Sequence, residues 1–351
     1  MTVLAFNIFI LIIEVPLLIY ISKVKEHAVS LSFLFGILVI LARFLSPIIF
    51  FGSDFFGVVQ LWAWTLFLHG PIYFTVLSII FLPRSKTGST FCLSIVVMIV
   101  SVWAYSYFYE AYNLKISRLS ISSSKIQNPV RIAVLADIQT RLPGKYEGEA
   151  FGKMMAERPD IILILGDIIQ SGQKSYDEKA ATLNRLMREA GIRAPLGIFV
   201  VEGNCDNTHP WEKIFSGIEG AHCVRTTESF DEGGIHLTAL SHYDSGNRKL
   251  AISGSSDYHI VLGHRPDFSL GQVNGNLLVA GHTHGGQICI PFFGPVMTLS
   301  KVPRKWASGL TEIADGKYLL VSRGVGLERG NAPALRFCCA PEIVIIDIVP
   351  K

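Results

Sequence analysis

The chain has 351 residues, of which 50% are hydrophobic and only 17% are charged, and its mean hydropathy of +0.41 is too high for an ordinary soluble protein. The formal net charge is +3 and no long run of Lys and Arg occurs, so nucleic acid is a poor candidate partner. Six cysteines occur without a Cys-x-x-Cys pair, which argues against a zinc ribbon and against a disulfide framework.

Four apolar segments in the first third of the chain are each long enough to cross a bilayer, which takes about 20 mostly apolar residues. They cover residues 2–22, 29–51, 57–82 and 91–111. The first segment has no basic amino-terminal region and is interrupted by Glu14, so we expect a retained span rather than a cleavable signal peptide. This pattern predicts a multi-pass protein of the cell membrane.

The composition changes near residue 112, from apolar segments to charged sequence punctuated by glycine. We therefore expect four transmembrane helices at residues 1–111, a Ser-rich linker at 112–129 and a globular domain at 130–351. The basic residues that flank the segments are Lys23, Lys25, Arg84 and Lys86 in the first and third links, and Lys115, Arg118 and Lys125 after the fourth segment. Because positive charge marks the cytoplasmic side, this count favours an extracytoplasmic domain by four charges to three.

Three ionisable residues, Glu14, Arg43 and His69, lie within the apolar segments. Such groups are costly in a bilayer and are usually paired. We expect a structural contact between Glu14 and Arg43, with a proton path or a lipid-headgroup site as the alternative.

Short apolar runs alternate with helical stretches from residue 130 onward, a pattern typical of an α/β domain. The predicted strands are Val130–Leu135, Ile161–Leu165, Ile198–Val201, His259–Leu262 and Leu277–Ala280. The predicted helices are 145–158, 174–190 and 210–218. We expect the five strands to lie in one sheet.

Each predicted strand is followed at once by side chains that can bind a metal. In chain order they are Asp137 and Gln139, Asp167, Asn204, His264, and His282 with His284. Ligands of α/β sheets bind beyond the carboxyl ends of the strands, so the fold would bring these side chains together. One such residue alone is usually a turn or cap residue. The full set of carboxylate, amide and imidazole groups suits manganese, iron or zinc, and an aspartate that bridged two ions would create the arrangement used in phosphoryl hydrolysis.

These residues resemble the calcineurin-like metallophosphoesterase superfamily in identity and order, over about residues 130–350. The family pattern is Asp-x-His, Gly-Asp-x-x-Asp, Gly-Asn-His-Asp or Glu, a single His, and Gly-His-x-His. Two further stretches resemble its bacterial membrane-associated branch, which includes lipid A pathway enzymes that cleave UDP-diacylglucosamine: GHTHGGQICIPFFGP and RGVGLERGNAPALRFCCAPEIVIIDI. The resemblance implies a two-sheet sandwich flanked by helices, preceded here by the transmembrane helices.

The resemblance also implies two divalent metal ions, for which manganese is favoured and iron or zinc are alternatives. One ion would be held by Asp137, Gln139, Asp167 and His284, and the other by Asp167, Asn204, His264 and His282. Asp167 would bridge the two ions, and a water between them would attack phosphorus in line. Arg141 and Arg265 are candidate substrate-binding residues because guanidinium groups match phosphate oxygens, although either could be a solvated surface residue.

Three positions depart from the family pattern. Gln139 replaces a histidine, and as a weaker donor its amide oxygen favours a hard ion such as manganese. Gln170 replaces an aspartate that is not usually a ligand. Cys205 replaces the histidine that protonates the leaving group, and a thiol is a poor acid at neutral pH. The candidate catalytic residues are thus Cys205, Asp206 and His209, with His209 as an alternative acid and Cys205 alternatively a small buried residue.

The sequence therefore favours a membrane-anchored, two-metal enzyme that hydrolyses a phosphodiester or pyrophosphate bond. Four membrane segments are more than an anchor needs, which favours a lipid-linked substrate such as a UDP-diacylglucosamine-like molecule. A UDP-linked substrate would require a cytoplasmic domain, against the charge count. The alternatives are an inactive receptor or scaffold that keeps the fold, and a transporter with a regulatory domain.

Overall fold

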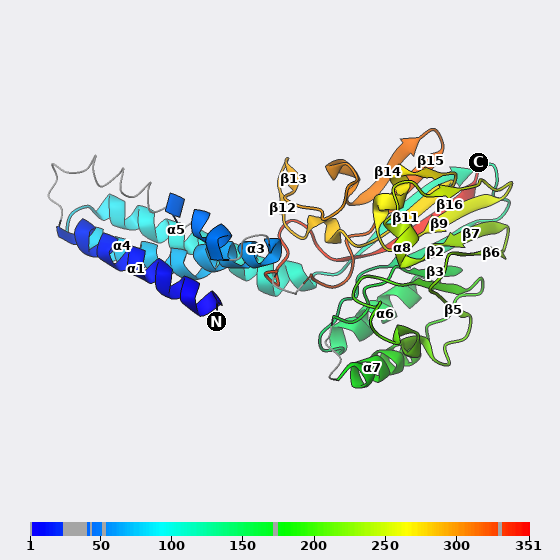
Figure 1. Cartoon of the computed structure of the whole chain (residues 1–351), viewed down its shortest axis with the longest axis horizontal. Helices are drawn as coiled ribbons and strands as arrows, with labels where there is room; N and C mark the ends of the chain where they lie inside the picture. The colour runs from blue at the N-terminus through cyan, green and yellow to red at the C-terminus, as the bar shows by residue number, and fades with distance from the viewer. Residues whose placement is uncertain (1, 24–40, 43, 51–53, 171–174, 329–331) are drawn as a thin grey trace. The chain divides into compact units, whose positions relative to one another are not determined.

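The computed structural model describes residues 2–23, 41–42, 44–50, 54–170, 175–328 and 332–351. These residues divide into two compact units. The first consists of Met1–Tyr107 with Arg329–Ala334, and the second of Phe108–Glu328 with Leu335–Lys351. Helices make up the first unit, whereas the second contains the sheets (Figure 1).

Three helical stretches in the described residues are long and apolar enough to cross a membrane: Val3–Lys23, Phe55–Phe81 and Lys86–Tyr112. They are built from α1 (Thr2–Lys23), α3 (Phe55–Trp64), η2 (Thr65–His69), α4 (Gly70–Phe81), α5 (Lys86–Ala104), η3 (Tyr105–Tyr109) and η4 (Glu110–Tyr112). They match the first, third and fourth predicted segments. The second predicted segment lies mostly outside the described residues, although 41, 42 and 44–50 are helical.

The ionisable residues of the apolar helices are paired in a way that the sequence did not predict. His69 Nδ1 lies 3.5 Å from Glu14 Oε2, and His69 Nε2 lies 2.9 Å from Asn7 Oδ1. The Glu14 and His69 side chains are both buried, as expected for polar groups among apolar helices. The predicted partner, Arg43, lies outside the described residues.

The second unit is a sandwich of two six-stranded sheets. The first sheet has the strand order β1 (Lys115–Ser123), β16 (Glu342–Pro350), β2 (Val130–Leu135), β3 (Ile161–Ile164), β4 (Ile198–Val201) and β5 (Ala221–Val224). The second has the order β14 (Gly309–Ala314), β15 (Lys317–Val321), β11 (Leu277–Ala280), β9 (Tyr258–Leu262), β7 (Ile235–Ala239) and β6 (Glu228–Glu232). The predicted sandwich is confirmed.

The expectation that all five ligand-bearing strands share one sheet is wrong. Strands β2, β3 and β4 are parallel neighbours in the first sheet, whereas β9 and β11 are parallel neighbours in the second. All five are mostly apolar, apart from Arg131 in β2 and His259 in β9, and nearly every residue is buried because both sheets are covered on both faces. Polar and apolar residues do not alternate in such runs, so the sequence does not show which sheet a strand joins.

Three apolar cores hold the sandwich together. Inward-facing residues such as Val134, Leu163, Leu262 and Val279 fill the space between the sheets. The outer face of the first sheet packs on α6 (Lys145–Ala156) and α7 (Tyr176–Glu189), through residues that include Phe151 and Leu183. The outer face of the second sheet is covered largely by loops and by the short helices η6 (Pro266–Leu270) and η8 (Arg304–Trp306). The predicted helix at 210–218 is the 3-10 helix η5 (Trp211–Phe215).

Half of the segment predicted to be a linker, nine of the residues 112–129, forms the edge strand β1. It pairs in parallel with β16 over nine residues, from Lys115 opposite Glu342 to Ser123 opposite Pro350. Leu119 and Ile121 pack into the core between the sheets, while serines alternate with them along the strand. The serine content therefore hid a half-buried strand.

Candidate metal centre

The oxygen ligands predicted from the sequence lie in loops at the carboxyl ends of β2, β3 and β4. Asp137, Gln139 and Asp167 are almost fully buried. The loops are tied together by their backbones, since the Gln139 N–H donates to the Asp167 carbonyl over 2.8 Å. Gly203 must be glycine, because a Cβ there would collide with the Asp167 carboxylate. Close packing of these loops thus brings three chelating groups to one place.

The imidazole ligands lie in loops that leave β9 and β11 in the second sheet. His264 follows β9, and His282 and His284 follow β11, where His284 begins the one-turn helix η7 (His284–Gly286). Five of the seven predicted ligands adopt left-handed backbone angles, with φ between 41° and 69°: Asp137, Gln139, Asp167, His282 and His284. Such angles cost about 1–3 kcal/mol at a non-glycine residue and concentrate at functional sites.

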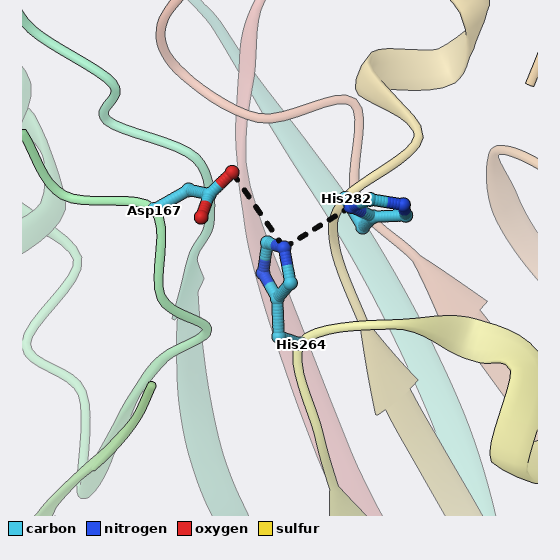
Figure 2. Close-up of side chains that lie close together, drawn as sticks. All are labelled: Asp167, His264 and His282. Carbon is cyan, nitrogen blue, oxygen red and sulfur yellow. Dashed lines mark hydrogen bonds and ion pairs between the residues drawn. The ribbon is translucent and has the colours of Figure 1, made fainter. Parts of the chain in front are cut away.

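His264 stands at the centre of the cluster. Its Nδ1 lies 2.8 Å from the Leu165 carbonyl oxygen and must donate to it, so the neutral ring carries its lone pair on Nε2. That nitrogen lies 3.0 Å from Asn204 Oδ1, 3.6 Å from Asp167 Oδ2 and 3.1 Å from His282 Nδ1. Figure 2 shows the Asp167, His264 and His282 side chains converging from three loops. Ligand atoms of these three residues lie within 4.8 Å of one another, close enough to share a cation.

Three buried polar atoms of the predicted ligands have no hydrogen-bond partner among the described residues: Gln139 Oε1, His282 Nε2 and His284 Nδ1. A buried acceptor without a partner costs about 1–3 kcal/mol, so such atoms are rare unless a ligand binds them. Divalent ions would satisfy these oxygen and nitrogen donors. The donor set therefore fits a metal centre.

The electrostatics of the cluster also favour cations. Burial raises the pKa of Asp137 well above its ordinary range, and the nearby Asp167 carboxylate adds to this; burial raises the pKa of Asp167 to about 6. Burial lowers the pKa of His264 and of His282 to about 3, and lowers that of His284 as well. The imidazoles are thus neutral and can donate lone pairs, and the raised pKa values of the two carboxyl groups show that nearby positive charge does not offset their burial.

Asp206, a predicted catalytic residue, holds the loops together. Its buried carboxylate accepts the backbone N–H groups of Asp167, Ile168 and Gly203, over 2.7, 3.0 and 2.9 Å. These bonds fasten the loop after β3 to the loop after β4. In this structure the Asp206 carboxylate positions the two ligand loops, and its catalytic role stays a prediction.

The other candidate catalytic residues differ in their placement. The Cys205 N–H donates to Asp167 Oδ1 over 2.8 Å, which brings the Cys205 side chain to the cluster. Burial raises the pKa of the Cys205 thiol, so it stays protonated. The ring of His209 instead stacks on Tyr176, with ring centroids 4.2 Å apart, against the core beneath α7.

The two candidate phosphate-binding arginines differ as well. Arg141 is exposed to solvent. Arg265 is half-buried, its Nε is buried without a hydrogen-bond partner, and it lines a cleft of about 740 Å³. The other basic residues of that cleft are His242, Arg248 and Lys249. Arg265 directly follows the central His264, and the ring centroid of His242, in the same cleft, lies 6.0 Å from that of His264, so the cleft lies next to the cluster and carries the positive charge of its arginine and lysine side chains.

Sequence reasoning missed Glu328. Its Oε2 accepts a hydrogen bond from Gln139 Nε2 and its Oε1 one from Gln170 Nε2, each over 3.0 Å, while its backbone N–H donates to Gln287 Oε1 over 2.9 Å. Two of the three departures from the family pattern therefore contact a single carboxylate. The available signal was that the two glutamine side chains carry amide N–H groups that need an acceptor, but the sequence did not show where that acceptor lies.

Comparison with known proteins accords with this geometry. Residues 130–286 match the family model described as calcineurin-like phosphoesterase. The chain carries a calcineurin-like metallophosphoesterase domain. The resemblance inferred from the motifs is thereby confirmed. Members of this family use divalent metal ions to hydrolyse phosphoric esters, so the protein is a metal-dependent hydrolase.

Three relatives extend the comparison. The uncharacterized metallophosphoesterase YkuE of Bacillus subtilis is 29% identical over 54% of this chain and 68% of its own length. The phosphodiesterase YaeI of Escherichia coli is 24% identical over 63% of this chain and 83% of its own. The UDP-2,3-diacylglucosamine pyrophosphatase LpxG of Chlamydia trachomatis is 23% identical over 70% of this chain and 93% of its own.

Proposed function

We propose that this metallophosphoesterase is a membrane-anchored, two-metal enzyme that hydrolyses a phosphodiester or pyrophosphate bond in a lipid-linked substrate. The observation that carries the proposal is the convergence of Asp167, His264 and His282 beside unpartnered Gln139 and His284 atoms. Asp137, Gln139, Asp167 and His284 would hold one ion, and Asp167, Asn204, His264 and His282 the other. Oxygen donors make up much of this set, which favours manganese.

Divalent ions held by these residues would lower the pKa of a bound water and would offset charge on the transferring phosphoryl group. The protein's own residues place the substrate. Arg265 and the basic cleft that it lines would bind the phosphate oxygens. Cys205 holds its proton too tightly to act as an acid, which favours a leaving group that departs as an anion. A nucleotide phosphate, released from a pyrophosphate, is such a group.

An apolar hairpin beside the metal loop supports a lipid-linked substrate. Strands β12 (Cys289–Ile290) and β13 (Gly294–Pro295) form this hairpin directly after η7 (Figure 1). Phe292 at its tip is fully exposed and Phe293 is 58% exposed. Arg304 lies over the Phe293 ring, 4.5 Å from its centroid, and Lys301 and Lys305 are exposed nearby in the chain. Exposed aromatic side chains beside basic ones suit an amphiphile with an anionic headgroup.

The first test is hydrolysis of bis(p-nitrophenyl) phosphate by the detergent-purified full chain with Mn²⁺, beside p-nitrophenyl phosphate as a monoester. We expect turnover of the diester to exceed that of the monoester. Faster turnover of the monoester would overturn the diester or pyrophosphate assignment. Absence of turnover with metal bound, on these esters and on UDP-linked lipids, would favour the receptor or scaffold interpretation.

The side of the membrane on which the globular domain lies decides which substrates it can reach. This side can be tested with Cys338, which is exposed in the globular domain. A membrane-impermeant maleimide applied to intact cells should label Cys338 if the domain is extracytoplasmic, as the flanking charges favour. Cys338→Ser is the control for labelling at other cysteines. Labelling that appears only after lysis would place the domain in the cytoplasm, where nucleotide-linked lipids are available.

A further inference from the structure

We propose that Glu328 orients the Gln139 side chain so that its oxygen, rather than its nitrogen, faces the first metal ion. This proposal rests on the metal centre of the proposed function. A carboxamide has two ends of similar shape, and only the oxygen can bind a cation. A glutamine in place of a histidine is therefore a useful ligand only where something fixes which end points to the ion.

The contacts of Gln139 show what fixes it. Its Nε2 donates to Glu328 Oε2 over 3.0 Å and lies 3.5 Å from Cys205 Sγ, while its Oε1 is buried and has no hydrogen-bond partner in the part of the chain that the structure describes. A carboxylate can only accept hydrogen bonds, so rotating the amide by 180° would set two oxygens against each other. Glu328 thus selects the rotamer that leaves Oε1 available.

Glu328 is itself held in place from two sides. Gln170 Nε2 donates to the second carboxylate oxygen, and Gln287 accepts the backbone N–H of Glu328 over 2.9 Å. We call Glu328 with its three partners, Gln139, Gln170 and Gln287, the glutamine clamp. Gln287 follows the loop that carries His282 and His284, so the clamp joins loops of both sheets.

The clamp gives a common reason for two departures from the family pattern. A histidine at position 139 would bind through a ring nitrogen and would need no neighbour to choose between oxygen and nitrogen. A glutamine at 139 requires a carboxylate beside it, and the glutamine at 170 supplies the second donor that fixes this carboxylate. Substitution of Glu328 should therefore lower the metal affinity only while residue 139 is glutamine.

The test is a double-mutant cycle read out by Mn²⁺ affinity of the detergent-purified full chain, measured by calorimetry without substrate. Glu328→Gln should weaken Mn²⁺ binding by about 10- to 100-fold, the usual effect of removing a group that orients a metal ligand. In the Gln139→His background the same change should alter affinity by less than about 3-fold. Glu312→Gln, on an exposed position of β14, is the matched control and should leave the affinity unchanged.

The outcomes separate this proposal from the proposed function. An equal loss of affinity in both backgrounds would overturn the proposal, because Glu328 would then act independently of Gln139. Wild-type protein that binds no Mn²⁺, or any other divalent ion, would overturn the metal centre itself. Should Glu328→Gln fail to fold, Glu328→Ser, which removes the carboxylate without adding amide donors, is measured in both backgrounds with the same expectation.

Discussion

The two sheets of the sandwich contribute different chemistry to one site. The first sheet supplies the oxygen donors and the second the nitrogen donors: Asp137, Gln139, Asp167 and Asn204 on one side, and His264, His282 and His284 on the other. All three departures from the family pattern, at Gln139, Gln170 and Cys205, lie in loops of the first sheet. The predicted imidazole ligands thus all match the family pattern, whereas the departures lie among the predicted oxygen ligands and their neighbours, where we expect metal affinity and the choice of leaving group to differ.

The way in which the two sheets would share one metal centre depends most on Asp167, the predicted ligand of the first sheet that would bind both ions. Asp167→Asn should lower kcat/KM for bis(p-nitrophenyl) phosphate by about 1,000-fold, since a metal contributes several kcal/mol to the transition state. The bound metal, measured by mass spectrometry, should fall in parallel. A variant that keeps both ions and most of its activity would show that the two sheets do not share a bridging ligand.

A second prediction concerns how the loops of the first sheet are held. Asp206→Ala removes the acceptor of three buried backbone N–H groups and should destabilise the domain by about 3 kcal/mol or more. Thermal unfolding of the metal-free protein measures this. Asp231→Ala, at a side chain 78% exposed on β6, is the control and should have little effect. If Asp206→Ala left the stability unchanged but abolished activity, Asp206 would instead act as a catalytic residue.

The candidate ligands could be proposed from the sequence because they follow mostly apolar runs, and ligands of α/β folds bind at strand ends. The division of these strands between two sheets could not be predicted, since polar and apolar residues do not alternate in buried runs such as Ile161–Ile164 and Leu277–Ala280. The left-handed backbone at Asp137 and His282 was also hidden, because neither residue is a glycine. Glu328 contacts Gln139 only through tertiary structure, which no local pattern in the chain encodes.

A third prediction tests whether Cys205 limits the choice of substrate. Cys205→His would restore an imidazolium beside the leaving group, and general acid catalysis contributes about 100-fold or more where the leaving group is poor. We expect a gain for diesters with alkyl leaving groups and little change for bis(p-nitrophenyl) phosphate, whose leaving group needs no proton. The ratio of the two kcat/KM values is the measurement. A ratio equal to that of the wild type would show that this position does not deliver the proton.

The smallest predicted effect lies on the second sheet's side, in the hairpin that follows the imidazole loop. The double variant Phe292→Ser, Phe293→Ser removes exposed aromatic surface next to Arg304 and should raise KM for a lipid-linked substrate by about 10-fold. Full burial of an aromatic side chain contributes roughly 1.5–3 kcal/mol, and only part of each ring would be buried on binding. KM for a soluble diester should change far less, and Leu270→Ser, an exposed apolar residue on η6, serves as the control. An equal change for both substrates would mean that the hairpin shapes the metal loop. In that case the second sheet would contribute only metal ligands, and recognition of the lipid would have to lie elsewhere in the chain.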